Sequence, residues 1–271
     1  MIPPFIEQAF MNTVDTFFKF LPQDRPTLEQ LKNCKLISHR GERDNKIVFE
    51  NTLASLGKAV DHSIWGIEFD IRWTRDLVPV VFHDKDCKRV FKNNLIISEV
   101  DFKSLREKFP LIPSFSEVIK AFAKKSHLVI EIKKEPFPDL PKQQAILKDH
   151  LKNLQEQEDF HIITLHPENL PLVDFLHSKT KALVSDINVT KLAQITQEKN
   201  LAGLLGHYLF LNNELKNKIH ANKQILGTGY VRSKNLLFRE LGRGVDWIFS
   251  NEAIFIDRIR KQAIQSLEKS L

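Results

Sequence analysis

Short apolar runs alternate with amphipathic stretches along most of the chain. Eight runs have the length and the Val, Ile and Leu content typical of strands buried on both faces. They span Leu36–Ser38, Gly66–Arg72, Leu128–Ile132, His161–Leu165, Ala182–Val184, Leu201–Leu205, Gln224–Thr228 and Asp246–Ser250. Strands that alternate with helices favour a parallel sheet with helical crossovers.

Stretches with helical periodicity lie between these runs and after the last one. The predicted helices are Thr52–Val60, Ser114–Lys125, Pro141–Gln157, Pro167–His177, Val189–Glu198, Asn212–Ala221, Ser233–Leu241 and Glu252–Ser270. Ser114 and Glu117 form a capping box, and Asn251 is placed to cap the last helix. Eight strand and helix pairs in roughly 235 residues predict an α/β fold, a (β/α)₈ TIM barrel.

The connection from Arg72 to His127 is too long for a simple crossover. It contains an extra extended run, Pro79–Phe82, which is followed directly by His83 and Asp84. We therefore expect a small excursion between the second and third barrel strands, which brings His83 over the barrel mouth.

The first residues have a helical pattern of their own. The apolar positions are Ile6, Phe10, Val14, Phe17 and Leu21, and Thr27 with Gln30 predicts a capping box for a short second helix. We assign residues 1–33 to an N-terminal helical extension and 34–271 to the barrel domain. The amphipathic helix is predicted to cap the barrel. A membrane-surface or dimer helix is the alternative, but membrane contact is not expected because Lys19 is its one basic residue.

Composition narrows the class of protein. With 271 residues, 42% of them hydrophobic, the chain can bury one large core. The net charge is +6, and the basic residues are scattered along the chain, with no cluster longer than a pair. This distribution argues against a nucleic-acid partner. Cys34 and Cys87 are the two cysteines, so we expect no disulfide framework and a reducing, cytoplasmic compartment. The N-terminal segment does not have the pattern of a signal peptide or a membrane span.

Three carboxylates are predicted to meet at the C-terminal ends of two neighbouring strands. Glu68 and Asp70 lie on one face of the second strand, and Glu131 lies near the end of the next. They would repel one another unless a cation lay between them, and oxygen ligands suit Mg²⁺ or Ca²⁺. Pairing of Glu68 or Asp70 with Arg72 or Arg75 is the alternative. Glu50, before a helix, is an outer-shell group, a fourth ligand or a helix start signal.

Two histidines bracket these carboxylates in sequence. His39 follows the first apolar run, and His83 follows the extra one. Imidazole titrates near neutral pH, so two of them can divide the roles of general acid and general base. Either histidine can take either role. Asp84 is placed to orient His83, and His166, His207 and Tyr230 follow later strands where they could line a pocket.

The motifs in this region resemble those of the glycerophosphodiester phosphodiesterase family. They are His39-Arg40-Gly41, Glu50-Asn51-Thr52, Glu68-x-Asp70, Thr74-Arg75-Asp76 followed by Val78–Asp84, and Val129–Lys133. The resemblance implies a metal-dependent hydrolase that converts a small glycerophosphodiester to sn-glycerol 3-phosphate and an alcohol. Arg40 and Lys133 would then bind the phosphate, and one Mg²⁺ or Ca²⁺ would lie on the three carboxylates. A lysophospholipase D-type reaction on a larger lipid, or a catalytically silent binding barrel, are the alternatives.

Two positions depart from the family pattern. Leu77 follows Asp76 where family members usually have Gly, and Ser250-Asn251 stands where Thr-Asp is frequent. The first change suggests a different turn before His83. The second keeps a capping residue but removes a carboxylate, and neither affects a residue assigned to metal binding or proton transfer.

Overall fold

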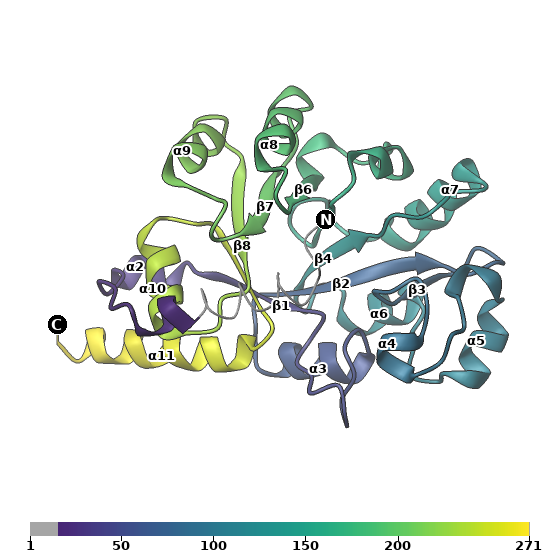
Figure 1. Cartoon of the computed structure of the whole chain (residues 1–271), viewed down its shortest axis with the longest axis horizontal. Helices are drawn as coiled ribbons and strands as arrows, with labels where there is room; N and C mark the ends of the chain where they lie inside the picture. The colour runs from purple at the N-terminus through teal and green to yellow at the C-terminus, as the bar shows by residue number, and fades with distance from the viewer. Residues whose placement is uncertain (1–15, 271) are drawn as a thin grey trace.

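Eight parallel strands close into a barrel in the computed structural model, which describes residues 16–270 (Figure 1). They are β1 (Lys35–His39), β2 (Gly66–Trp73), β4 (His127–Ile132), β5 (Phe160–Thr164), β6 (Lys181–Ser185), β7 (Gly203–His207), β8 (Ile225–Gly229) and β9 (Trp247–Ser250). Strand β1 pairs with β9 on one side and with β2 on the other, which closes the ring. The predicted (β/α)₈ TIM barrel is confirmed.

Helices cover the outside of the barrel, as the periodicity predicts. They are α3 (Leu53–Asp61), α6 (Phe115–Phe122), α7 (Leu140–Leu151), α8 (Val189–Glu198), α9 (Asn213–Ala221), α10 (Lys234–Gly242) and α11 (Ala253–Glu268). One predicted helix is wrong, because residues 167–177 contain a 3₁₀ segment, η2 (Pro167–Val173), in place of an α-helix. Pro171 has no amide hydrogen, so an α-helical ladder cannot continue through it.

The excursion between β2 and β4 folds as a small unit of its own. Its elements are β3 (Pro79–Val81), α4 (Lys88–Phe91), η1 (Ile97–Glu99) and α5 (Phe102–Lys108), and they lie together beside α6 in Figure 1. Strand β3 runs antiparallel to β2, where the extra extended run was predicted. The turn before it holds Leu77 at φ 62°, a left-handed conformation that favours glycine. Buried apolar residues, among them Val80, Phe82 and Ile97, give the excursion a core that fixes the loop after β3.

The described part of the N-terminal extension packs on the barrel. Residues 16–20 are helical, and Phe18 lies edge-on to Tyr208 with ring centroids 5.5 Å apart. Helix α2 (Leu28–Lys32) begins at the predicted capping box of Thr27 and Gln30. The rest of the predicted amphipathic helix, with Ile6, Phe10 and Val14, lies outside the described residues, and the domain boundary at 33/34 stays a prediction. Within residues 16–270, no helix combines the length and the apolar character needed to cross a bilayer.

Two buried histidines pair at the N-terminal end of the barrel strands. His127 Nδ1 lies 2.8 Å from the Glu158 carbonyl oxygen, which can only accept, so this nitrogen carries the hydrogen. In neutral His127, Nε2 then accepts from His161 Nδ1–H at 2.9 Å. Burial lowers the pKa of His127 to about 4 and that of His161 to about 3. Both rings are therefore neutral in the folded protein at neutral pH.

We expect the free energy of unfolding to fall as the pH drops from about 6.5 to about 4. The unfolded chain takes up protons on these histidines near their ordinary pKa of 6.5, and the folded chain does so only near 4 and 3. Each histidine then contributes a slope of up to about 1.4 kcal/mol per pH unit. Urea unfolding at several pH values between 7.5 and 4 measures this slope of the unfolding free energy, with the double variant His127→Phe/His161→Leu as control. An equal slope in the double variant would contradict this origin.

Candidate active site

The three predicted carboxylates converge at the C-terminal ends of β2 and β4. Asp70 pairs in register with Glu131 on the neighbouring strand, and Glu68 lies two residues before Asp70 on the same face. All three side chains are buried, and one oxygen from each lies within 4.8 Å of the others. Ile67, Phe69 and Ile71 alternate with them and pack into the hydrophobic core outside the barrel. The alternation of the sequence therefore brings the acids to one point.

Two cationic side chains contact this cluster. Lys133 Nζ lies 2.5 Å from Glu131 Oε1 and 3.3 Å from Asp70 Oδ1. Arg40 Nε lies 3.2 Å from Asp70 Oδ2 on the other side. Burial alone would raise the pKa of Asp70, but these two cations bring it well below its ordinary value. Asp70 is therefore ionised and is the most strongly paired member of the cluster.

The other two carboxylates are not fully balanced by these cations. Burial, followed by the charges of Asp70 and Glu131, raises the pKa of Glu68 well above its usual range. Burial and Asp70 also raise the pKa of Glu131. A further positive charge at this point would hold all three acids in their ionised form.

The cluster fits a hard divalent cation. Among the described residues, none donates a hydrogen bond to the buried Glu68 Oε1 or Asp70 Oδ1, although Lys133 Nζ lies 3.3 Å from the latter as an ion pair. All the candidate ligand atoms are carboxylate oxygens. The alternative pairing is not seen: Arg72 lies 3.5 Å from Glu135, and Arg75 lies 3.2 Å from Asp101. Glu68, Asp70 and Glu131 are thus the residues that would hold the ion.

His39, the last residue of β1, is held in one tautomer. Its Nδ1 lies 2.7 Å from Asn251 Oδ1, and a nitrogen of Arg43 lies 2.8 Å from the same atom. A guanidinium only donates, so that atom is the amide oxygen and His39 Nδ1 donates to it. The lone pair of neutral His39 is then on Nε2, which lies 3.8 Å from Glu68 Oε2. Burial and the nearby Arg40 lower the pKa of His39 to about 3.

Asn251 has a different role from the one that the sequence predicts. The N-cap position of α11 is Glu252, without a side-chain cap, and the first amides of the helix donate to Glu42 Oε1, that of Ala253 at 2.8 Å. The prediction of Asn251 as the helix cap is therefore wrong. Its amide oxygen instead orients His39, because β1 and β9 are neighbours in the closed barrel. The departure from the family pattern at this position therefore does affect a residue assigned to proton transfer.

His83 enters the site from the excursion, as predicted. Its Nδ1 lies 2.6 Å from Asp84 Oδ1, and its carbonyl oxygen accepts from Arg72 Nε at 2.8 Å. Burial alone would raise the pKa of Asp84, but hydrogen bonds from His83 and Arg89 bring it below its ordinary value. An ionised carboxylate only accepts, so His83 Nδ1 carries a hydrogen. His39 thus has an amide as its partner, whereas His83 has a negative charge.

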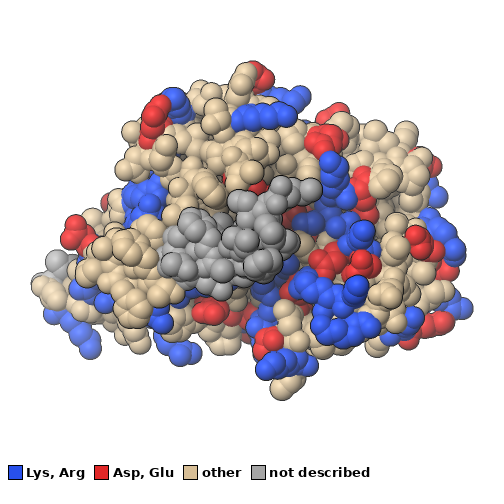
Figure 2. Space-filling model, viewed as in Figure 1, with Lys and Arg blue, Asp and Glu red and all other residues tan. Residues whose placement is uncertain are grey.

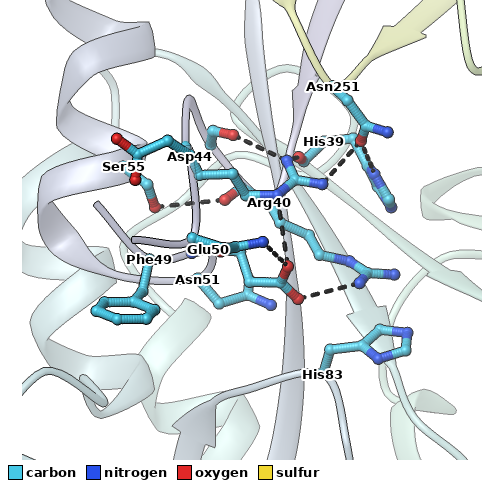
Figure 3. A network of polar contacts seen from close by, with 12 residues as sticks. His39, Arg40, Asp44, Phe49, Glu50, Asn51, Ser55, His83 and Asn251 are labelled. Carbon is cyan, nitrogen blue, oxygen red and sulfur yellow. Dashed lines mark hydrogen bonds and ion pairs between the residues drawn. The ribbon is translucent and has the colours of Figure 1, made fainter. Parts of the chain in front are cut away.

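Glu50 is the centre of an arginine network beside the carboxylate cluster (Figure 3). It accepts from Arg40 at 3.1 Å and from Arg89 at 2.5 and 3.1 Å, and Arg43 Nε lies 3.5 Å away. Burial alone would raise the pKa of Glu50, but Arg89 and Arg40 bring it to about 2. Its oxygens are engaged by arginines, which favours the predicted outer-shell role over that of a fourth metal ligand. The sequence pattern does not predict Arg43 or Arg89.

The remaining predicted pocket residues lie at the ends of later strands. The Tyr230 ring lies 6.1 Å from the His39 ring and 5.4 Å from the His207 ring, measured between centroids. Tyr230 adopts φ 67°. His166 lies 3.5 Å from Glu168 and is partly exposed. Tyr230 thus lies beside His39, and His207 lies beside Tyr230, whereas His166 lies beside a surface carboxylate.

Charged side chains of both signs gather on the side of the molecule where the excursion lies (Figure 2). In Figure 3 the Arg40 guanidinium lies between the rings of His39 and His83. The site therefore combines a set of acids for a cation, two imidazoles with different partners, and the cations Arg40 and Lys133 for an anion. Groups of these kinds can support hydrolysis of a phosphodiester.

The known proteins to which this chain is similar are phosphodiesterases. The family model described as "Glycerophosphoryl diester phosphodiesterase family" matches residues 39–252. A protein named glycerophosphodiester phosphodiesterase from Bacillus altitudinis is 23% identical over 247 residues, which cover 84% of this chain and 97% of that protein. Glycerophosphodiester phosphodiesterase 1 of Rattus norvegicus is 34% identical over 98 residues, 35% of this chain and 29% of the rat protein.

Solved structures share the fold. The phosphodiesterase of Oleispira antarctica, in complex with the product sn-glycerol-3-phosphate, matches with a TM-score of 0.72 at 22% identity over 85% of this chain and 96% of that one. The glycerophosphodiester phosphodiesterase of Thermotoga maritima matches with a TM-score of 0.66 at 19% identity, over 83% of this chain and 98% of that one.

Proposed function

The chain belongs to the glycerophosphoryl diester phosphodiesterase family of hydrolases, and from that premise we propose that it hydrolyses a small glycerophosphodiester to sn-glycerol 3-phosphate and an alcohol. The strongest support is the convergence of Glu68, Asp70 and Glu131 beside His39, with His83 brought in from the excursion. The product bound to the Oleispira antarctica protein, which has the same fold, is in keeping with this substrate class.

One Mg²⁺ or Ca²⁺ on the three carboxylates would draw negative charge from the phosphate oxygens and orient the diester. Arg40 and Lys133 face the same point and would hold the phosphate oxygens by charge-assisted hydrogen bonds. Both are already paired with Asp70, at 3.2 and 3.3 Å, so their positions are fixed before substrate binds. Such pre-organised cations stabilise charge that develops in the transition state.

The two histidines have partners that favour opposite roles. His39 carries its lone pair on Nε2 and has a neutral amide partner, so it is suited to accept the proton of the attacking hydroxyl, from water or from the substrate's own glycerol. His83 is beside the ionised Asp84, which stabilises an imidazolium that can donate a proton to the departing alcohol oxygen. With water as the nucleophile, one P–O bond forms as the other breaks, and the proton lost by the water is balanced by the one gained by the alcohol. With the glycerol hydroxyl as the nucleophile, the same exchange gives a cyclic glycerophosphate first, and a water molecule must then open its ring to give sn-glycerol 3-phosphate.

Incubation of the purified protein with glycerophosphocholine tests this proposal. We expect release of glycerol 3-phosphate that requires a divalent cation, stops with EDTA and returns when Mg²⁺ or Ca²⁺ is added. A Glu68→Gln variant should need more metal for the same rate, because it loses one charged oxygen ligand. Choline and glycerol 3-phosphate are followed together, since release of phosphocholine would indicate cleavage of the other P–O bond.

The same assay separates the alternatives. Release of choline from lysophosphatidylcholine but not from glycerophosphocholine would show a lysophospholipase D-type enzyme. No release from either substrate with any divalent cation would contradict hydrolysis and favour a binding barrel.

A further inference from the structure

Helix α4 of the excursion places one arginine between two carboxylates of the site. Arg89 Nε lies 2.7 Å from Asp84 Oδ2, and its two terminal nitrogens lie 2.5 and 3.1 Å from the oxygens of Glu50. Its side chain is 46% exposed, whereas that of Glu50 is 4% exposed. The three guanidinium nitrogens are thus used on two acids that come from different parts of the chain.

Each of these acids contacts a residue of the proposed reaction. The second oxygen of Asp84 accepts from His83 Nδ1 at 2.6 Å. Glu50 accepts from Arg40 at 3.1 Å, and Arg40 in turn lies 3.2 Å from Asp70. A continuous chain of charge-assisted contacts therefore runs from His83, through Arg89, to Arg40. It joins the excursion to the segment between β1 and α3.

We propose that Arg89 is a positioning residue for the reaction, and this inference rests on the proposed function. It fixes the Asp84 carboxylate that orients His83, and it fixes the Glu50 carboxylate that orients Arg40. A guanidinium suits this task because its planar fork engages both acids at once, which a Lys ammonium on a flexible stem does not. Arg89 thereby fixes the position of His83, the proposed proton donor, relative to Arg40, which would bind the phosphate.

The excursion has other attachments, so removal of Arg89 should leave it folded. Val81 N donates to the Pro113 carbonyl at 2.8 Å, and Arg72 donates to the His83 carbonyl at 2.8 Å. The buried core around Val80 and Phe82 does not include Arg89. Replacement of Arg89 is therefore expected to misalign His83 and Arg40 without unfolding the excursion.

The experiment compares Arg89→Met, Arg89→Lys and Lys88→Met with the wild type on glycerophosphocholine. Lys88 is exposed on the same helix, so its replacement removes the same charge from outside the network. We expect Arg89→Met to lower kcat by about 10- to 100-fold, the usual effect of losing an outer-shell partner, with a smaller change in KM. Arg89→Lys should recover part of the rate, and added guanidinium should partly restore Arg89→Met, because the site of Arg89 is open to solvent.

A second measurement does not depend on turnover. Imidazole ¹⁵N NMR should show a protected His83 Nδ1–H in the wild type and in Lys88→Met, and faster exchange of that hydrogen in Arg89→Met. Wild-type kcat in Arg89→Met, or an equal loss in Lys88→Met, would overturn the inference, the latter in favour of long-range attraction of the substrate. If the wild type itself is inactive, the proposed function fails, and an unchanged His83 signal in Arg89→Met would overturn the positioning role separately.

Discussion

Replacement of Asp70 by Asn is expected to lower turnover by about a thousandfold or more and to remove tight binding of the divalent ion. Asp70 is the acid of the cluster that contacts both cations, at 3.2 Å from Arg40 and 3.3 Å from Lys133, and it is one of the three candidate ligands. An amide in its place keeps the shape but removes the charge, which leaves the two cations to repel an incoming metal ion. Loss of several kcal/mol of transition-state stabilisation by the ion corresponds to a rate change of this size.

Calorimetric titration with Mg²⁺ and Ca²⁺ measures the binding, alongside the rate on glycerophosphocholine. Glu135→Gln is a matched control, because Glu135 is a partly buried acid that pairs with Arg72 and lies outside the cluster of three. It should bind metal as the wild type does. A wild-type titration curve in Asp70→Asn would remove Asp70 from the ligand set.

The elements that the sequence predicts best are those determined by local pattern. Each barrel strand is a short apolar run because parallel strands are covered on both faces, so the runs mark their positions directly. Glu68 and Asp70 interrupt such a run at alternate positions, and alternation in a strand places both on one face. The carboxylate cluster was therefore predictable once β2 and β4 were recognised as neighbours.

Contacts that depend on closure of the barrel were not predictable in this way. Asn251 reaches His39 across 212 positions of sequence, and nothing local distinguishes it from a helix cap. Arg89 contacts Glu50 only because the excursion folds back toward the barrel. The sequence pattern of its short helices does not predict that position. The 3₁₀ segment at Pro167–Val173 was missed for a different reason, since its apolar spacing is that of a helix but Pro171 prevents one.

The partners of the two histidines lead to the last prediction. His39→Ala and His83→Ala should each lower the rate on glycerophosphocholine by at least about a hundredfold, the scale of lost general acid or base catalysis. The rates alone do not distinguish the roles, because both variants lose a proton transfer in the same reaction.

A substrate with a better leaving group distinguishes them. Glycerol 3-phosphate esterified to p-nitrophenol releases a stable anion that needs no proton as the P–O bond breaks, so a general acid is of little use to it. With His83 as the acid, beside the Asp84 carboxylate at 2.6 Å, His83→Ala should recover most of its rate on this ester. His39→Ala should stay impaired, because its nucleophile still has to lose a proton to a base. The reverse pattern would exchange the two roles, and it would mean that the amide of Asn251 supports an imidazolium better than the carboxylate of Asp84 does.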